Sequence, residues 1–195
     1  MTRFLLAATL LFLLSCGSPA PEADVPPELS LADALTFHAS YEDGMDAAYA
    51  RGDRRIYSAP SYDELADRGP GIWDQTIDIA YDEGLHDHAL RFQQRNTKAV
   101  FYTAQDNVAF SPDGWTGTIS FWLKLDPATD LEPGYCDPIQ ITDTAYNDNA
   151  IWVDFTDQNP RDFRLGVFGE LDEWNPDDTP PNDNPDFMGR LVIVD

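Results

Sequence analysis

The stretch Thr118-Ile-Ser-Phe-Trp-Leu-Lys-Leu125 carries the clearest secondary-structure signal of the chain. Its aliphatic and Phe side chains fall on every second position, and Ser120, Trp122 and Lys124 take the positions between them. Successive side chains of a β-strand point to opposite faces, so this period of two residues predicts a strand with one apolar face over 118–125.

Outward from this stretch, further short segments show similar alternation or are rich in β-branched and aromatic residues. Clusters of Pro, Gly, Asp and Asn separate them, which is the composition of turns. No segment keeps an apolar period of 3.6 residues. We therefore expect an all-β protein, an antiparallel β-sandwich or jelly roll. The predicted strands are 34–40, 55–59, 76–81, 88–93, 99–103, 118–125, 138–142, 150–155, 163–168 and 190–194; a helical turn is expected at 62–67, and a long surface loop at 175–185.

The first sixteen residues have the pattern of an export signal. Arg3 is followed by an apolar run over 4–14 that is too short to span a bilayer as a mature helix. The run ends in Leu13-Leu-Ser-Cys16, which resembles the lipobox of bacterial lipoproteins. That resemblance implies cleavage before Cys16, acylation of Cys16, and an exported protein anchored by lipid at the outer membrane or cell surface. The alternative is an ordinary signal peptide with a chance cysteine.

A spacer follows the cysteine. Residues 17–31 are rich in proline and offer almost nothing to bury, so we expect an extended, semi-rigid linker. The predicted organisation is a signal peptide at 1–15, lipidated Cys16 with a linker at 16–31, and one β-domain over 32–195.

The chain is strongly acidic, with 35 Asp and Glu, 12 Lys and Arg, and a formal net charge of −23. Nucleic-acid binding is disfavoured, because phosphate contacts need basic patches. The acidity fits either a solvated, self-repelling surface or calcium sites built from loop carboxylates. The calcium candidates, which are equally good turn formers, are Asp43, Asp46, Asp143, Asn147 and Asp148.

The chain has two cysteines. If Cys16 carries lipid, Cys136 has no intramolecular partner for a disulfide. A catalytic thiol would need a neighbouring base, and no local pattern supplies one. We expect Cys136 to be a buried structural thiol.

Two motifs together resemble the laminin-G-like domains of the concanavalin A-like lectin/glucanase superfamily. Gly84-Leu-His-Asp-His-Ala-Leu-Arg-Phe92 is similar to the family's Gly-x-x-Gly-x-Ala-Leu-x-Phe signature, with His88 in place of a glycine. The stretch 116–124 resembles the strand that follows it in the family, and 35–44 resembles the family's first strand. The resemblance implies a jelly roll in which Leu90, Phe92 and Phe121 line the space between two curved sheets.

The family normally continues with further strands that this sequence does not supply after 190–194. The resemblance therefore implies an incomplete jelly roll with exposed sheet edges. Such a domain would be a truncated product, or would be completed by a strand-donating partner or a dimer.

Glycoside hydrolysis needs two carboxylates across the scissile bond. The superfamily's glucanases carry them on one strand as Glu-x-Asp-x-Glu or a close variant, and Glu170-Leu-Asp-Glu-Trp-Asn175 lacks the second glutamate. We therefore assign no catalytic residue and expect a non-catalytic module that binds a polysaccharide or a cell-surface protein. A degenerate glycoside hydrolase and a non-functional fragment are the alternatives. Ring-stacking candidates for a ligand are Tyr146, Trp152 and Trp174.

Overall fold

The computed structural model describes residues 30–109, 114–142 and 144–194. The chain divides into two units, Met1–Ala34 and Leu35–Asp195. In the described part of the first unit, the short helix α1 (Leu31–Ala34) is closed by a 2.7 Å hydrogen bond from the Ser30 hydroxyl to Asp33. The proposed lipid site, Cys16, lies outside the described residues. Within the described residues, no helix is long and apolar enough to cross a membrane.

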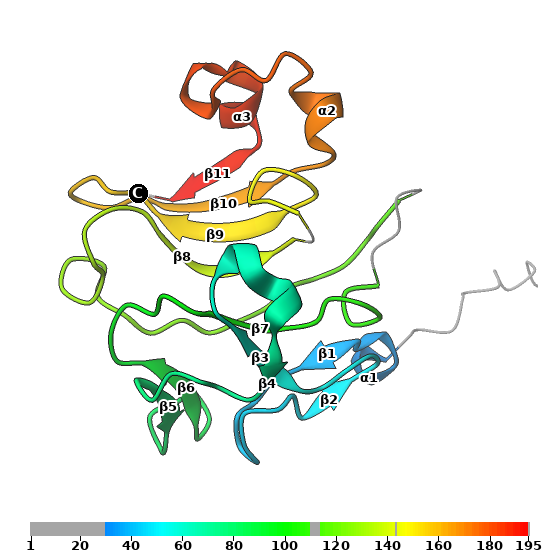
Figure 1. The fold of residues 1–195 in the computed structure, drawn as a ribbon, viewed down its shortest axis with the longest axis vertical. Coiled ribbons are helices and arrows are strands. Elements are labelled where there is room, and N and C mark those ends of the chain that lie inside the picture. Colours follow the sequence, from blue (N-terminus) through cyan, green and yellow to red (C-terminus); the bar gives the residue numbers. More distant parts are fainter. Residues whose placement is uncertain (1–29, 110–113, 143, 195) are drawn as a thin grey trace, which may run out of the picture. The chain divides into compact units, whose positions relative to one another are not determined.

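Most regular elements of the second unit are short antiparallel strands, which confirms the predicted all-β class. The described strands form four separate sheets of two, four, three and two strands (Figure 1). The connectivity specific to a jelly roll stays a prediction. The strands are β1 (Phe37–His38), β2 (Tyr49–Ala50), β3 (Ile56–Ala59), β4 (Gly69–Pro70), β5 (Ile77–Ala80), β6 (Ala89–Phe92), β7 (Ala99–Tyr102), β8 (Cys136–Ile141), β9 (Ile151–Phe155), β10 (Phe163–Val167) and β11 (Leu191–Val194).

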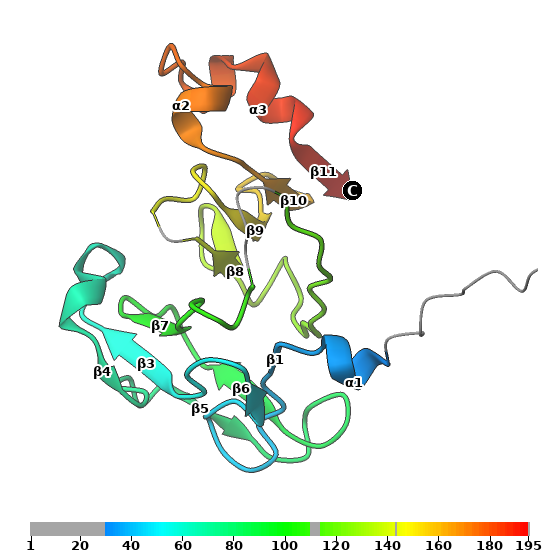
Figure 2. The same ribbon diagram turned by 90° about the vertical axis from the view of Figure 1, so that its right-hand side faces the viewer.

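The largest sheet has the order β11-β10-β9-β8, and every neighbouring pair is antiparallel. The strand β9, one of the two inner strands, has four consecutive buried residues, from Trp152 to Phe155. Beside this sheet lie α2 (Leu171–Trp174), the 3-10 turn η2 (Pro181–Asp183) and α3 (Pro185–Gly189). Both ribbon views place α2 and α3 next to each other beyond β10 and β11 (Figures 1 and 2).

The main aromatic core lies where this sheet meets α2 and α3. Phe168 is at its centre, with ring centroids 5.7 Å from Trp152, 5.3 Å from Trp174 and 5.3 Å from Phe187. All four side chains are buried, together with Ala150. The predicted surface loop at 175–185 thus contains η2 and the beginning of α3, a helix whose Phe187 completes the core.

The remaining sheets are small. β3 pairs with β4 and β7, and η1 (Tyr62–Asp67) follows β3. The predicted helical turn at 62–67 is confirmed as this 3-10 element. The hairpin of β5 and β6 turns at Gly84, where a Cβ atom would lie 2.1 Å from the carbonyl oxygen of His88, so the turn requires glycine.

The predicted strand over 118–125 is wrong. Residues 114–126 lie outside any strand, and the side chains of Ile119, Phe121 and Leu123 are exposed by 40%, 37% and 42%. A strand is defined by hydrogen bonds to a neighbour, and alternation alone supplies none. Phe92 is 54% exposed as well, so neither it nor Phe121 lines a closed space between sheets. The resemblance to laminin-G-like domains stays a prediction.

Candidate functional site

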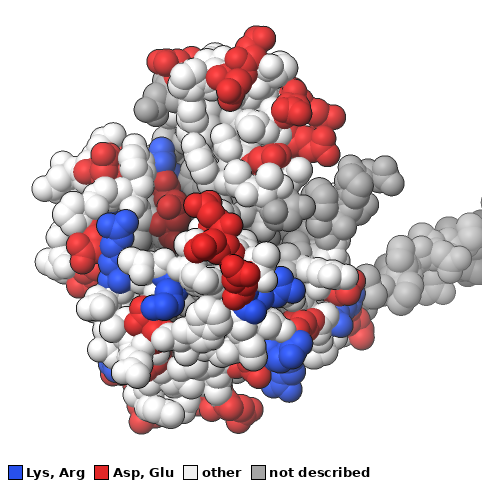
Figure 3. All heavy atoms as spheres, viewed as in Figure 1, with Lys and Arg blue, Asp and Glu red and all other residues white. Residues whose placement is uncertain are grey.

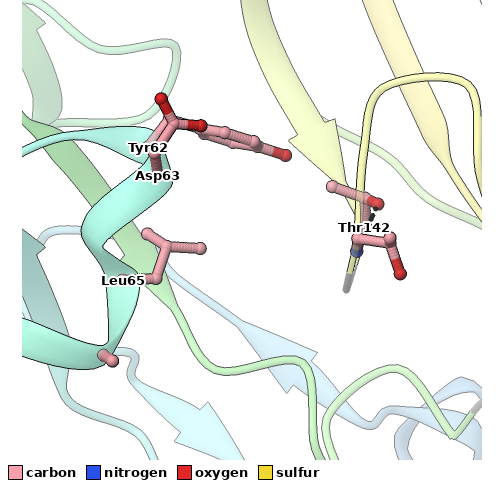
Figure 4. A pocket seen from close by; sticks show the side chains of 6 residues that line it. Tyr62, Asp63, Leu65 and Thr142 are labelled. Atoms are coloured by element: carbon pink, nitrogen blue, oxygen red, sulfur yellow. Dashed lines mark hydrogen bonds between the residues drawn. The ribbon is translucent and has the colours of Figure 1, made fainter.

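An open hollow lies between η1 and the end of β8. It has a volume of about 350 Å³ and is lined by Tyr62, Asp63, Leu65, Ala66, Thr142 and Thr144, a group that we call the Tyr62 pocket. In Figure 4, the side chains of Tyr62 and Leu65 extend from η1 toward the segment that carries Thr142. The pocket is open to solvent, and its lining mixes one aromatic ring with carboxylate, hydroxyl and aliphatic groups.

Local structure places the two walls. Ser61 precedes η1, and its hydroxyl donates a 2.9 Å hydrogen bond to the Glu64 carboxylate across the first turn. Tyr62 and Asp63 lie within this turn. On the other wall, the Thr142 hydroxyl contacts the carbonyl oxygens of Ala145 and Asp148 at 2.9 and 3.1 Å. These contacts hold the Thr142 side chain in place on the wall that faces Tyr62.

Two carboxylates act on the Tyr62 hydroxyl. Partial burial and then the negative charges of Asp137 and Asp63 raise the pKa of Tyr62 above its ordinary value. The Tyr62 side chain stays neutral at physiological pH, and the residue is 45% exposed. A neutral tyrosine can pack its ring on an apolar face and can donate or accept a hydrogen bond, while the neighbouring carboxylates repel anionic ligands.

Two of the three ring-stacking candidates are core residues. Trp152 is 3% exposed and Trp174 is 7% exposed, so neither ring has a face available to a ligand. These two assignments are not compatible with the structure. Both rings pack against Phe168, Trp152 from the inner strand β9 and Trp174 from the end of α2. Tyr146 is 50% exposed, in the loop that also contains Thr142 and Thr144.

The calcium candidates belong to two segments far apart in the sequence, and three of them accept hydrogen bonds from residues of other elements. Asp46 accepts from the Ile56 amide at 3.0 Å, and Asp148 accepts from the Leu171 amide at 3.0 Å. The Asn147 carbonyl oxygen accepts from Trp174 Nε1 at 3.0 Å. Asp43 is exposed, and Asp143 lies outside the described residues. Within the described residues, no three His, Cys, Asp or Glu side chains are grouped so as to hold a metal ion. Calcium binding stays a prediction.

A second, smaller hollow of about 180 Å³ is lined by Asp148, Asn149, Glu170, Leu171 and Asp172. Glu170 precedes the helix α2, and Asp172 lies within it. The glucanase pattern requires its carboxylates on one strand, and here they flank and occupy a helix. Acidic side chains gather over α2 and α3 in the upper part of Figure 3, in a segment that includes Glu173, Asp177 and Asp178.

Cys136 begins β8 and is half-buried, with no disulfide partner among the described residues. Burial and then the charge of Asp137 raise the pKa of its thiol. A raised pKa keeps the thiol protonated and weakly nucleophilic, which agrees with a structural role.

The residues of the Tyr62 pocket were not among the sequence-based candidates. Tyr62 and Thr142 are eighty positions apart and belong to segments with ordinary turn and strand patterns. The sequence carries no signal that brings these segments together. Comparisons of this chain with protein-family models, with curated proteins and with solved structures find no match.

Proposed function

We propose that this chain is an exported, lipid-anchored, non-catalytic module that binds a neutral carbohydrate in the Tyr62 pocket. The observation that supports this proposal is the half-exposed ring of Tyr62, which faces Thr142 across an open hollow beside the Asp63 carboxylate. A pyranose ring presents an apolar C–H face that packs on an aromatic ring, and its hydroxyls donate to carboxylate oxygens.

The charge of the pocket selects among carbohydrates. Asp63 and Asp137 make the surroundings of Tyr62 electronegative, and the whole chain carries a net charge of −23. Uronate and sulfate groups would be repelled at short range. We therefore expect neutral or amino-substituted glycans to bind and acidic polysaccharides not to bind.

The membrane part of the proposal rests on the sequence around Cys16. A lipid at this position and the proline-rich spacer that follows would hold the β-domain at the membrane surface. The test is cell fractionation. The full chain should be recovered with membranes and labelled by radioactive palmitate, and Cys16→Ser should abolish both.

Carbohydrate binding is tested with the full chain in detergent on an array of neutral and acidic glycans. The array is run with calcium and with a chelator, because calcium binding by the acidic turns is also predicted. Removing a half-buried ring contact costs about 1–2 kcal/mol of binding free energy, so Tyr62→Ala should raise the Kd about 5- to 30-fold.

Tyr49→Ala is the matched control, because Tyr49 is 44% exposed but lies on β2, away from the lining of the pocket. This variant should bind like the wild type, and Tyr146→Ala tests the remaining aromatic candidate. No binding to any neutral glycan in either buffer would refute the proposal, and so would an equal loss in Tyr62→Ala and Tyr49→Ala.

A further inference from the structure

Residues 116–125, which we call the unpaired segment, have the sequence pattern of a strand but form no strand in the described part of the chain. No backbone hydrogen bond joins this segment to any other described residue. Its apolar side chains are exposed: 40% for Ile119, 37% for Phe121, 42% for Leu123 and 76% for Trp122. Ile, Phe, Trp and Thr favour strands because they pack well on a pleated surface, and here that surface is left open to solvent.

The unpaired segment also differs from the rest of the chain in charge. The chain has 35 acidic residues, yet residues 116–125 contain none, and Lys124 is one of only two lysines. Two copies of a chain with a net charge of −23 repel each other over most of their surfaces. An apolar segment without carboxylates is where this repulsion is weakest.

We propose that the unpaired segments of two copies of this chain pair as antiparallel strands and form a homodimer. Two identical antiparallel strands are related by a two-fold axis, so the contact is isologous and closes at two subunits. The backbone groups of 116–125 then gain ladder hydrogen bonds, and the exposed side chains gain cross-strand neighbours. This inference does not depend on the Tyr62 pocket, which uses other residues.

The sequence pattern favours one register. Placing Trp122 of the two copies opposite each other puts Phe121 opposite Leu123 and Ile119 opposite Leu125, with each apolar face kept together. Lys124 then lies opposite Ser120, so no like charges face each other across the pair. The two Lys124 side chains are four residues apart along the strands, about 13 Å.

Sedimentation equilibrium of the full chain in density-matched detergent tests the proposal. The wild type should be dimeric at about 100 µM and should associate more tightly as salt screens the net repulsion. Ser120→Pro should weaken the dimer at least about tenfold, since proline disrupts a strand ladder. Its monomer should keep the melting temperature that the wild type shows when diluted to a monomer, because the segment makes no backbone hydrogen bonds to other described residues.

Thr97→Pro is the matched control, since Thr97 is also exposed and outside any strand, and it should leave the dimer intact. A lysine-specific cross-linker on mixed light and heavy-isotope protein should join Lys124 to Lys124 between copies. Cross-links between copies at Lys98 should be absent.

Three results would overturn the proposal. The first is a monomer at all concentrations and salt levels. The second is a dimer that Ser120→Pro leaves unchanged. The third is a dimer that Val192→Lys dissolves, because Val192 is 59% exposed on the edge strand β11 and that result would place the contact there.

Discussion

Gly166 on β10 lies directly opposite Trp152 on β9, and the indole ring covers the position that a side chain at 166 would occupy. A Cβ atom at 166 would be 2.5 Å from Cε2 and Cζ2 of Trp152 and 2.7 Å from Cε2 of Phe168. The missing side chain of Gly166 thus provides the space in which the aromatic core packs.

Gly166→Ala should therefore destabilise the domain. The added methyl group overpacks the core, which typically costs about 1–3 kcal/mol in unfolding free energy. Denaturant unfolding followed by tryptophan fluorescence measures this loss. Gly169→Ala is the control, because a Cβ atom there meets nothing within 4 Å. Equal stability of Gly166→Ala and Gly169→Ala would contradict the packing described here.

Arg164 and Asp154 form a second cross-strand pair of β10 and β9, and it is a buried ion pair. The side chains are 13% and 5% exposed, and Arg164 Nε donates to the Asp154 carboxylate at 2.9 Å. Arg164→Met leaves a buried carboxylate without its partner and should cost about 3–5 kcal/mol. The double variant Arg164→Met with Asp154→Leu should regain most of that loss. If urea unfolding shows that the losses of unfolding free energy in the two single variants add in the double variant, Arg164 and Asp154 are not coupled as an ion pair.

Asn184 joins the 175–184 loop to α3 through both ends of its buried amide. Its Oδ1 accepts from the Asp186 amide at 2.9 Å, and its Nδ2 donates to Asn175 Oδ1 at 2.8 Å. Asn184→Ala removes the helix cap and one buried hydrogen bond, at a cost of about 1.5–3 kcal/mol.

Asn184→Asp keeps the capping oxygen but turns a carboxylate oxygen toward Asn175 Oδ1. This variant should be destabilised at pH 7 and should recover as the pH falls, because a protonated carboxyl can donate again. Thermal melts of Asn184→Ala and Asn184→Asp between pH 4 and pH 7 check this. A pH-independent difference between the two variants would argue against the amide contact.

Cys136 should react slowly with iodoacetamide in the folded protein. Burial raises its pKa above the ordinary value of 9.0, so at a given pH less thiolate is present than in the unfolded chain. The thiol's contribution to stability is complete below the unfolded-state pKa and is lost as pH rises through the higher folded-state pKa. Mass spectrometry of the Cys136 peptide gives the rates in buffer and in urea. Equal rates across pH 7–10 would show that the thiol is neither buried nor shifted.

The alternation of side chains was sufficient to place most strands. Residues 55–59, 76–81, 88–93, 99–103 and 163–168 were predicted as strands, and each contains one within a residue or two of its predicted ends. Turn chemistry between these segments limits where a strand can extend. The helix α3 was missed although its signal was present: Asn184 caps it, and Pro185 occupies its first turn.

The candidate site was much harder to predict than the strands. Trp152 and Trp174 are large aromatic residues whose sequence context does not distinguish a ligand platform from a core position. Their burial depends on Phe168 and Phe187, which reach them from other elements. The Tyr62 pocket likewise exists only because η1 and the end of β8 face each other.

The sequence by itself determined the acidic surface, the all-β class and the extended tendency of each short apolar segment, because these follow from composition and from side chains within a few residues. Only the tertiary structure decided which of these segments found partners. Residues 163–167 and 118–125 alternate in similar ways, yet the first is paired on both edges and the second lies outside every sheet. A strand's hydrogen bonds come from another part of the chain, so local sequence specifies the tendency and the fold supplies the partner.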